Sequence, residues 1–193
     1  MANKYNYKPR PGAMTVPGLS HIKIFDAAQA VREYIKSLTG RDLVKNHLPI
    51  LFDHLSTDKN LPIYYSVVDD NKLPSNVEAI TNGNSIKIKQ SVWDAVENSS
   101  HPYHRRYRFT LCHEIGHAIL HSEVDHGFAR MSEPTAPFES SEWQADTFSG
   151  YLLVSLEDVK YSNFCSLSLS NICNISKPAA SKIIKNYRNS IMR

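Results

Sequence analysis

The stretch "RFTLCHEIGHAILH", residues 108–121, decides the fold. Its apolar residues recur at helical spacing and predict one helix over about residues 105–122. His113 and His117 are four residues apart, so they project from one helix face only about 40° apart around the axis. Glu114 lies next to this pair. These residues indicate either a metal-binding catalytic helix or an ordinary helix rich in histidine.

The spacing favours the metal-binding interpretation. Two imidazoles four residues apart can bind the same ion, whereas Glu114 is placed to reach a water molecule on that ion. In this H-E-x-x-H arrangement the two histidines are ligands, and the carboxylate is the general base for the metal-bound water. Apolar neighbours such as Ile115 and Ile119 give the pair a rigid, water-poor setting. We therefore predict His113 and His117 as ligands and Glu114 as the catalytic residue.

A third ligand is expected from a second helix over about residues 141–154. Glu142 is the preferred ligand, because it completes a His₂Glu site with an open position for water. Asp146 lies one turn later and is expected to accept a hydrogen bond from the other nitrogen of a ligand histidine. His121 is about 12 Å from His113 along a continuous helix, too far to share its ion. His126 stays an alternative ligand that reaches back after the helix ends.

The rest of the chain predicts an α+β fold. Residues 1–20 are rich in proline and glycine and predict a flexible or surface-hugging arm. Helical spacing follows over 25–40 and about 46–56, then a strand in "LPIYYSVVDD". The stretch "VEAITNGNSIKIKQ" predicts a hairpin that turns at Asn82-Gly83, and hence a small antiparallel sheet. The Ser-rich tail ends in a further helix, "SKPAASKIIKNYRNSI".

Composition restricts the class of protein. The net charge is +3, from 22 basic and 19 acidic residues, too mild to imply a nucleic acid or membrane partner by itself. The N-terminus has no apolar signal-peptide core, and no apolar run approaches the ~18 residues that span a bilayer. Cys112, Cys165 and Cys173 lack C-x-x-C spacing and are interpreted as reduced thiols. We therefore expect a cytoplasmic protein without a membrane partner.

"RFTLCHEIGHAILH" followed by "EWQADTFSGYLLVS" resembles the ImmA/IrrE family of metallopeptidases. That family has an Arg-Phe-Thr lead-in, H-E-x-G-H-x-x-x-H, and later E-x-x-A-(Asn or Asp)-x-F-(Ala or Ser)-x-x-L-L. The match is close over about 45 residues, and the hairpin and the helical tail agree more loosely. The chain departs from the family's common residues at Asp146, where Asn is usual, and at Ser155, where Pro is common.

The resemblance implies a zincin-like catalytic domain, which we place over residues 21–155, with 156–193 as a helical extension packed on it. It implies a metallo-endopeptidase in which His113, His117 and Glu142 hold Zn²⁺, and Glu114 is the base. Mn²⁺ and Fe²⁺ also suit imidazole and carboxylate ligands. It also implies a protein substrate: a helix-turn-helix repressor that is cut to switch on mobile-element or stress genes.

Two points of mechanism stay open in the sequence. An oxyanion donor is expected among the side chains of Tyr103, His104, Tyr107, His121, His126 and Tyr151. Strand 84–89 is a candidate for binding extended substrate by strand addition, if it lies at a sheet edge.

Two other functions compete with proteolysis. One is a metal-binding regulatory or toxin–antitoxin protein without peptidase activity. The other is a DNA-binding regulator, because "HRRYR" and the basic residues of the tail supply positive charge and the tail imitates a recognition helix. Since "HRRYR" leads directly into the metal helix, we expect structural roles for its arginines and no direct nucleic-acid binding.

Overall fold

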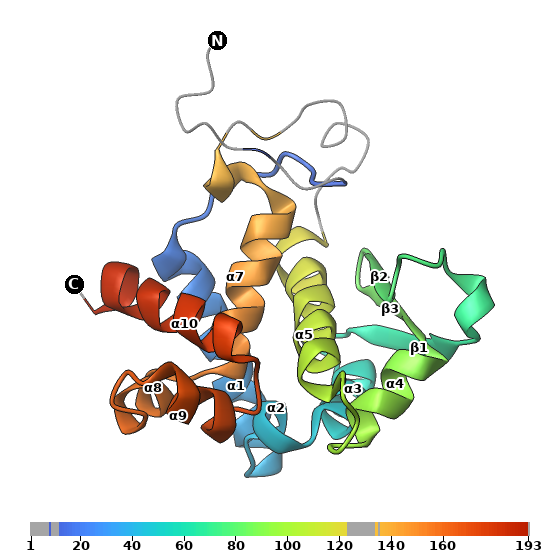
Figure 1. Ribbon diagram of the computed structural model, residues 1–193. Helices are drawn as coiled ribbons and strands as arrows, with labels where there is room; N and C mark the ends of the chain where they lie inside the picture. Colours follow the sequence, from blue (N-terminus) through green and yellow to red (C-terminus); the bar gives the residue numbers. More distant parts are fainter. Residues whose placement is uncertain (1–7, 9–11, 123–133, 135, 193) are drawn as a thin grey trace.

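The computed structural model describes residues 8, 12–122, 134 and 136–192, and its fold is α+β (Figure 1). The strands are β1 (Tyr64–Val68), β2 (Ala79–Asn82) and β3 (Ser85–Lys89). The helices before the metal motif are α1 (His21–Thr39), α2 (Leu43–Asn46), α3 (Leu48–Thr57), the 3₁₀ helix η1 (Asp70–Lys72) and α4 (Gln90–Glu97). The later helices are α5 (His104–His121), the 3₁₀ helix η2 (Pro137–Glu139), α7 (Ser141–Leu153), α8 (Leu156–Tyr161), α9 (Ser166–Ile172), α10 (Lys177–Asn186) and the π-helix η3 (Tyr187–Ile191).

The sheet is mixed, which corrects the prediction of a purely antiparallel sheet. Its strand order is β1-β3-β2: β2 and β3 form the expected antiparallel hairpin, whereas β1 pairs with β3 in parallel. Residues 69–78 explain the difference, because this connection carries the chain from β1 past the position of β3 before β2 begins. As a result β3 is central, and β2 is an edge strand.

The hairpin alternates as its sequence predicts. Ile86 and Ile88 of β3 are fully buried and Lys87 is exposed. Burying one such side chain contributes about 1.5–3 kcal/mol. The turn lies one residue later than predicted: Asn82 is still paired with Ser85, and Gly83 begins the turn at a φ of +59°, a value that favours glycine.

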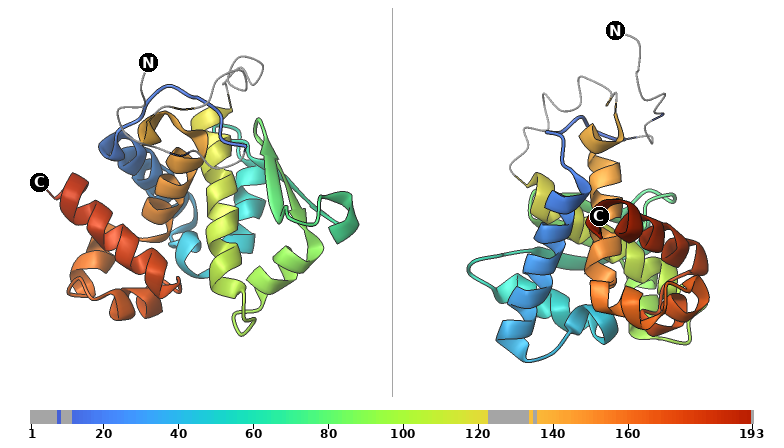
Figure 2. Two further views of the ribbon diagram at one scale, coloured as in Figure 1. Left: turned by 45° about the horizontal axis from the view of Figure 1, so that its top comes forward. Right: turned by 90° about the vertical axis from the view of Figure 1, so that its left-hand side faces the viewer.

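Helix α5 is the centre of the molecule, with the sheet on one side and α7 on the other (Figures 1 and 2). The two helices approach closely at Gly116. A Cβ atom built there would lie 3.1 Å from Phe148 Cδ1 and 3.2 Å from both Cα and the carbonyl oxygen of Ala145. Gly116 is therefore a packing residue, and it lets the backbone of α7 come within reach of the histidines on α5.

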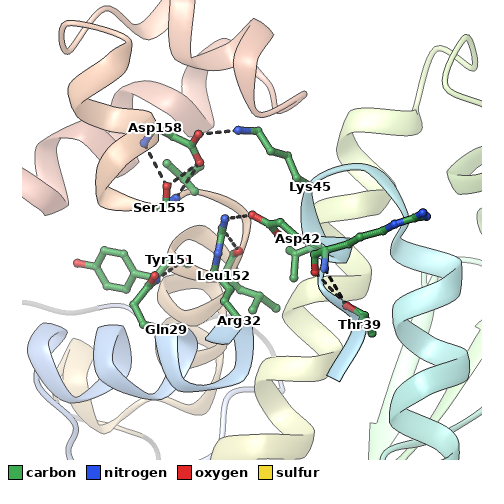
Figure 3. A network of polar contacts seen from close by, with 12 residues as sticks. Gln29, Arg32, Thr39, Asp42, Lys45, Tyr151, Leu152, Ser155 and Asp158 are labelled. Carbon is green, nitrogen blue, oxygen red and sulfur yellow. Dashed lines mark hydrogen bonds and ion pairs between the residues drawn. The ribbon is translucent and has the colours of Figure 1, made fainter. Parts of the chain in front are cut away.

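Helix α7 is tied down at its C-terminal end by side chains of α1 (Figure 3). The last carbonyls of a helix have no partner within it. Here Gln29 donates to the Tyr151 carbonyl at 3.0 Å, and Arg32 donates to the Leu152 carbonyl at 2.7 Å. Arg32 also pairs with Asp42, so α7 is fixed to the N-terminal part of the chain.

The arginines of "HRRYR" have structural partners. Arg108 is 2% exposed and donates to the carbonyls of Val44, Lys45, Cys173 and Asn174 at 2.6–3.0 Å. Arg105 donates to Asn174 Oδ1 at 3.0 Å, and Arg106 pairs with Glu78. Helix α5 thereby holds α2 and the turn between α9 and α10, and these contacts explain the basic cluster.

The two ends of the chain contact the central helices. Val16 N donates to the Glu139 carbonyl, and Ser141 N donates to the Met14 carbonyl, so residues 14–19 follow the start of α7. At the other end Tyr187 OH donates to the Val154 carbonyl at 2.6 Å. The division at residue 155 stays a prediction. Among the described residues, no helix combines the length and the apolar character needed to cross a bilayer.

Candidate metal centre

Three polar side chains from α5 and α7 converge on one point. His113 Nε2 lies 3.0 Å from His117 Nε2 and 3.4 Å from Glu142 Oε2, and His117 Nε2 lies 3.2 Å from Glu142 Oε1. All three side chains are largely buried, with exposures of 12–23%. Helix α5 supplies both histidines because one turn separates them. Helix α7 supplies Glu142 from its first turn.

These separations fit a tetrahedral ion. Ligand atoms about 2.05 Å from a tetrahedral zinc lie about 3.3 Å from one another. The observed distances of 3.0–3.4 Å match that spacing, and no other set of three such residues in the described part of the chain meets the same criterion. Two histidines and one glutamate are a ligand set of catalytic zinc sites that leave a position open for water.

The imidazole ring of His113 is oriented by a contact with Asp146. His113 Nδ1 lies 3.0 Å from Asp146 Oδ1, and a carboxylate can only accept, so the proton is on Nδ1 and the Nε2 lone pair faces the convergence point. Burial alone would lower the pKa of His113. The hydrogen bonds with Asp146 and Glu142 together have the larger, opposite effect, and they raise the pKa from 6.5 to about 9. The site therefore favours a cation at this point, either a proton or a metal ion.

His117 is oriented through a longer relay. The Gln144 amide donates through Nε2 to the carbonyls of Pro17 and Phe138, at 2.9 and 2.7 Å, which leaves Oε1 as the acceptor. His121 Nε2 lies 3.0 Å from that oxygen and must carry the proton, so His121 Nδ1 accepts. His117 Nδ1, 3.1 Å away, donates to it. The lone pair of His117 Nε2 therefore also faces the convergence point.

The electrostatics agree with three acceptors that share one cation. Burial raises the pKa of Glu142, but the hydrogen bonds with His113 and His117 outweigh it and lower that pKa well below the usual range. Burial lowers the pKa of His121 to about 4, so this relay residue is neutral at physiological pH. Two lone pairs and a carboxylate that face one another at 3.0–3.4 Å need a positive charge between them.

Glu114 lies beside this point and is held by the edge strand. Thr81 of β2 donates to Glu114 Oε2 at 2.6 Å, which leaves Oε1 for another partner. Glu114 is 8% exposed, and burial raises its pKa while the Thr81 hydrogen bond lowers it in part, so the net shift is upward. A carboxylate with a raised pKa is better matched to general base catalysis near neutral pH.

The convergence point opens into a cavity of about 360 Å³. The cavity is lined by residues of the site, of the edge strand and of the N-terminal arm. They include His113, Glu114, His117 and Glu142, then Ile80 and Thr81 of β2, and Gly12 and Met14 of the arm. A second cavity of about 640 Å³ is more apolar and lies between the arm and α7, where Leu19, Phe138 and Trp143 line it. The two cavities share no lining residue, and the chemistry lies in the smaller one.

The remaining sequence candidates are placed differently. His126, the alternative ligand, lies outside the described residues. Of the five described oxyanion candidates only His121 lines the cavity, and its N–H is already donated to Gln144. Tyr151 OH contacts His21 Nδ1 at 2.9 Å, and His104 contacts the Ala95 carbonyl. None of the five described residues offers a free donor to this cavity.

Thr81, Gln144 and the arm residue Met14 were not predicted as part of the site. Thr81 has no motif of its own and reaches Glu114 only because β2 is the edge strand beside α5. The contacts of Met14 and Gln144 join positions more than 120 residues apart in the sequence. The one signal for Gln144 is its place between Glu142 and Asp146 in the same motif.

Comparison with known proteins adds a family. Residues 96–167 match the family model of the IrrE N-terminal-like domain, peptidase family M78. The matched segment contains all of α5 and α7 and ends at the start of α9, so it includes every residue of the convergence point. No curated protein was found to match the chain.

Proposed function

We propose, on the premise that the chain belongs through residues 96–167 to the ImmA/IrrE family of peptidases, that it is a metallo-endopeptidase. In this proposal His113, His117 and Glu142 hold the ion, and Glu114 is the catalytic base. The single observation that carries the assignment is the convergence of three acceptor atoms within 3.0–3.4 Å beside the largely buried Glu114 carboxylate. Zn²⁺ is the expected ion, and Mn²⁺ or Fe²⁺ are the alternatives.

The proposed reaction needs contributions from a bound ion and from side chains of this protein. A zinc ion at this site supplies a Lewis acid that lowers the pKa of water toward ~7 and polarises a carbonyl. Glu114 accepts the proton of the attacking water through Oε1, the oxygen that Thr81 does not contact, and returns it to the leaving amine. Thr81 keeps the Glu114 carboxylate in place. Asp146 and His121 keep the imidazole lone pairs directed at the ion.

The substrate is expected to bind along β2. Strand addition to residues 84–89 was expected only if that strand lay at a sheet edge, and this condition is not met, because β3 is central in the sheet. The edge strand β2 lines the cavity instead, and its Ile80 is 47% exposed. An extended peptide added to β2 would form main-chain hydrogen bonds at the edge and pass the convergence point. This arrangement supports cleavage within a chain rather than at its end.

The substrate class rests on the family resemblance. The family that the chain resembles cuts helix-turn-helix repressors, so we propose that the substrate is a helix-turn-helix repressor, to be sought among those encoded near this chain. The decisive experiment incubates the purified, zinc-loaded protein with that repressor and identifies products by mass spectrometry. Glu114→Gln is the matched control, because it keeps the ligand set and removes the base. One discrete cut by the wild type alone is the expected result.

Two results would contradict the proposal in different ways. Substantial cleavage by Glu114→Gln would refute the base assignment. No cut of the repressor, with one zinc per chain measured by atomic absorption, would refute this substrate and favour the non-proteolytic metal-binding alternative. A panel of unfolded casein-type substrates then separates a peptidase with a different substrate from a metal-binding protein without peptidase activity. The peptidase still cuts some of these substrates, whereas the non-proteolytic protein cuts none.

A further inference from the structure

The larger, apolar cavity beside the N-terminal arm has no part in the proposed reaction. Its volume of about 640 Å³ lies within the range of small-molecule sites, roughly 300–1,000 Å³. The end of the arm, the start of α1, η2 and the first turn of α7 all contribute to its lining. Leu19, Phe138 and Trp143 give the cavity an apolar wall of the kind that holds the body of a small organic ligand.

Contacts between the arm and η2 hold this wall in place. Leu19 N donates to the Phe138 carbonyl at 3.1 Å, and Figure 2 shows this part of the arm, in blue, beside the start of α7. A Cβ atom built on Gly18 would lie 2.9 Å from Phe138 Cδ2, so the aromatic ring lies directly against the backbone of the arm. The rings of His21 and Trp143 meet edge to face, with their centroids 5.0 Å apart. The cavity is therefore bounded by packed rings and fixed backbone.

The polar side chains of the lining supply hydrogen-bond donors. The hydroxyl of the buried Tyr151 contacts His21 Nδ1 at 2.9 Å, its one partner among the described residues. A buried hydroxyl needs an acceptor, so Tyr151 donates to Nδ1, and the proton of the neutral imidazole is on Nε2. Burial, and then Lys182, lower the pKa of His21, so the ring is neutral at physiological pH. Ser20 and Ser190 add hydroxyl groups to the same lining.

The charge near this side of the cavity is positive. Lys182 of α10 acts electrostatically on the His21 imidazole, and the first turn of α1 contains Lys23 and no acidic residue. Among the described residues that line the cavity there is no aspartate or glutamate. An occupant that complements these donors and charges has an apolar body and a negatively charged acceptor. An aromatic monocarboxylate combines both properties.

The first turn of α7 has side chains in both cavities. Trp143 lines the apolar cavity, whereas Glu142, the residue before it, lines the smaller cavity and belongs to the candidate metal centre. Gln144, the residue after it, is fully buried and begins the relay to the metal centre. A single helical turn therefore connects the apolar wall with the metal chemistry.

The relay is also anchored on the segments that enclose the apolar cavity. Gln144 Nε2 donates to the carbonyls of Pro17 and Phe138 at 2.9 and 2.7 Å. Phe138 lines the cavity, and Pro17 precedes the lining residue Gly18. An occupant that packs against Phe138 and Leu19 thus stabilises the arrangement in which both acceptors of Gln144 are in place.

We propose that the apolar cavity binds an aromatic monocarboxylate and that this binding is coupled to metal binding at the candidate metal centre. The aromatic ring packs between Phe138 and Trp143, and the carboxylate accepts from His21. Because the ligand stabilises the anchored form of Gln144, the coupling is positive, and each ligand raises the affinity of the other by the same factor. The cavity is independent of the proposed peptidase function, and only the coupling uses its metal centre.

The first test titrates metal-free, full-length protein with 3-phenylpropanoate. It follows Trp143 fluorescence in the Trp93→Phe variant, which leaves one tryptophan, and the absence of metal prevents coordination of the carboxylate to an ion. We expect saturable binding with a Kd on the order of 0.1 mM. The uncharged 3-phenylpropan-1-ol should bind about tenfold more weakly, because it cannot form a charge-assisted hydrogen bond. No saturation up to about 5 mM acid, or equal affinity for the alcohol, would overturn the proposal.

A matched pair of variants on α1 locates the bound acid. Ile22 lines the cavity and is 55% exposed, and Leu38 is 53% exposed near the other end of the same helix. Ile22→Glu places a negative charge at the cavity and should weaken binding of 3-phenylpropanoate by about tenfold, whereas Leu38→Glu should change its Kd by less than about twofold. Equal effects of the two substitutions would overturn the assignment to this cavity.

The coupling is tested by zinc affinity, measured by chelator competition with and without saturating 3-phenylpropanoate. The acid should raise the zinc affinity of the wild type by about fivefold or more. Gln144→Met has no amide to anchor, so it should bind the acid normally and show no rise. An unchanged zinc affinity in the wild type would overturn the coupling.

Two further outcomes separate the coupling from the metal centre itself. A rise in zinc affinity that persists in Ile22→Glu at the same acid concentration would assign the effect to a carboxylate on the ion, and would overturn the coupling. Absence of zinc binding would overturn the metal centre together with the coupling, whereas the titration of the metal-free protein decides the cavity separately.

Discussion

At the scale of single residues, hydrogen-bond direction determines which ring nitrogen of His113 and of His117, the proposed ligands, keeps a lone pair for the convergence point. Asp146 sets this for His113 directly, and the His121–Gln144 relay sets it for His117. The relay ends on the Pro17 carbonyl, so a residue of the N-terminal arm takes part in orienting a ligand on α5. Partners of this kind are worth about 10–100-fold in metal affinity or activity.

Replacing His121 tests the relay. His121→Phe fills the space without an acceptor for His117 Nδ1, so zinc affinity should fall by about 10–100-fold in a chelator competition assay. His121→Asn places an amide oxygen near the position of Nδ1 and should recover most of that loss. His104→Phe is the control, since it removes another buried histidine of α5 whose ring contacts the Ala95 carbonyl. If the His121→Phe and His121→Asn variants lower the zinc affinity equally, His121 acts only through packing.

Thr81 gives a prediction about turnover rather than metal binding. Thr81→Val removes the donor to Glu114 Oε2, so the carboxylate loses its fixed position and its pKa rises further. We expect kcat to fall on the order of tenfold, with zinc affinity unchanged and the acid limb of activity moved to higher pH. Thr110→Val is a matched control that breaks a Thr–Glu hydrogen bond to Glu78. A normal kcat in Thr81→Val would contradict the positioning role.

At the scale of elements, the site depends on how closely α5 and α7 approach. Their contact at Gly116 and Ala145 has no space for a side chain on α5. Because the two candidate histidines lie on α5 and Glu142 lies on α7, the separation of the helices sets the distance from the histidines to Glu142. Helix packing is therefore part of the metal chemistry.

Substituting Gly116 should weaken the metal centre. In Gly116→Ala the new Cβ meets backbone atoms of Ala145 at 3.2 Å, so the helices must separate by a few tenths of an ångström. The strain costs about 1–3 kcal/mol and is offset in part by the higher helix propensity of alanine. Zinc affinity measured by calorimetry should fall. Gly150→Ala should leave the zinc affinity unchanged, since its Cβ meets only the Ile183 side chain of α10 and not the contact between α5 and α7.

The elements differ in how far the sequence predicts them. Helices α5 and α7 and their candidate residues follow from periodicity and spacing, because one helical turn is a local property. The pairing of β1 with β3 does not, because nothing within either strand encodes which neighbour it takes. Thr81 and Gln144 act through contacts more than 30 residues away in sequence, so no local pattern marks them.

At the scale of the whole molecule, Arg108 joins three separate parts of the chain. Its guanidinium is buried among the carbonyls of α2 and of the turn after α9, and it extends from the start of the metal helix. The ends of these helices carry partial negative charge, which offsets the cost of burying the cation. The arginine therefore fixes the N-terminal and C-terminal helices relative to the site.

Arg108→Lys should lower the free energy of unfolding by about 2–4 kcal/mol, because one ammonium cannot serve four carbonyls in a fork geometry. For a chain of this size each kcal/mol lowers Tm by roughly 2–4 °C. Arg106→Lys provides the comparison: its pair with Glu78 is exposed and should contribute about 1 kcal/mol or less. Equal Tm values for the two variants would contradict the role of Arg108 in fixing the N-terminal and C-terminal helices relative to the site.

Asp158 makes stability depend on pH. Burial raises its pKa, but hydrogen bonds from Lys45 and Ser155 outweigh burial, so its pKa in the folded state lies below the ordinary value of 3.8. Its contribution is therefore present above pH 3.8 and lost as pH falls through the folded pKa. Asp158→Asn should lower the free energy of unfolding in urea by about 1–2 kcal/mol at pH 7. The difference between the unfolding free energies of the variant and the wild type should become smaller below pH 4. A difference that stays constant down to pH 3 would exclude the ionised form as its cause.

The lining of the smaller cavity by Gly12 and Met14 has a practical consequence for producing the protein. A polyhistidine purification tag fused ahead of residue 1 would be linked through only eleven residues to Gly12, which lines the cavity of the proposed metal site. Its imidazoles would be present at high effective concentration and would compete for the ion. Metal content measured on such a fusion would then report metal bound by the tag as well as metal at the proposed site, so a cleavable tag gives the interpretable preparation.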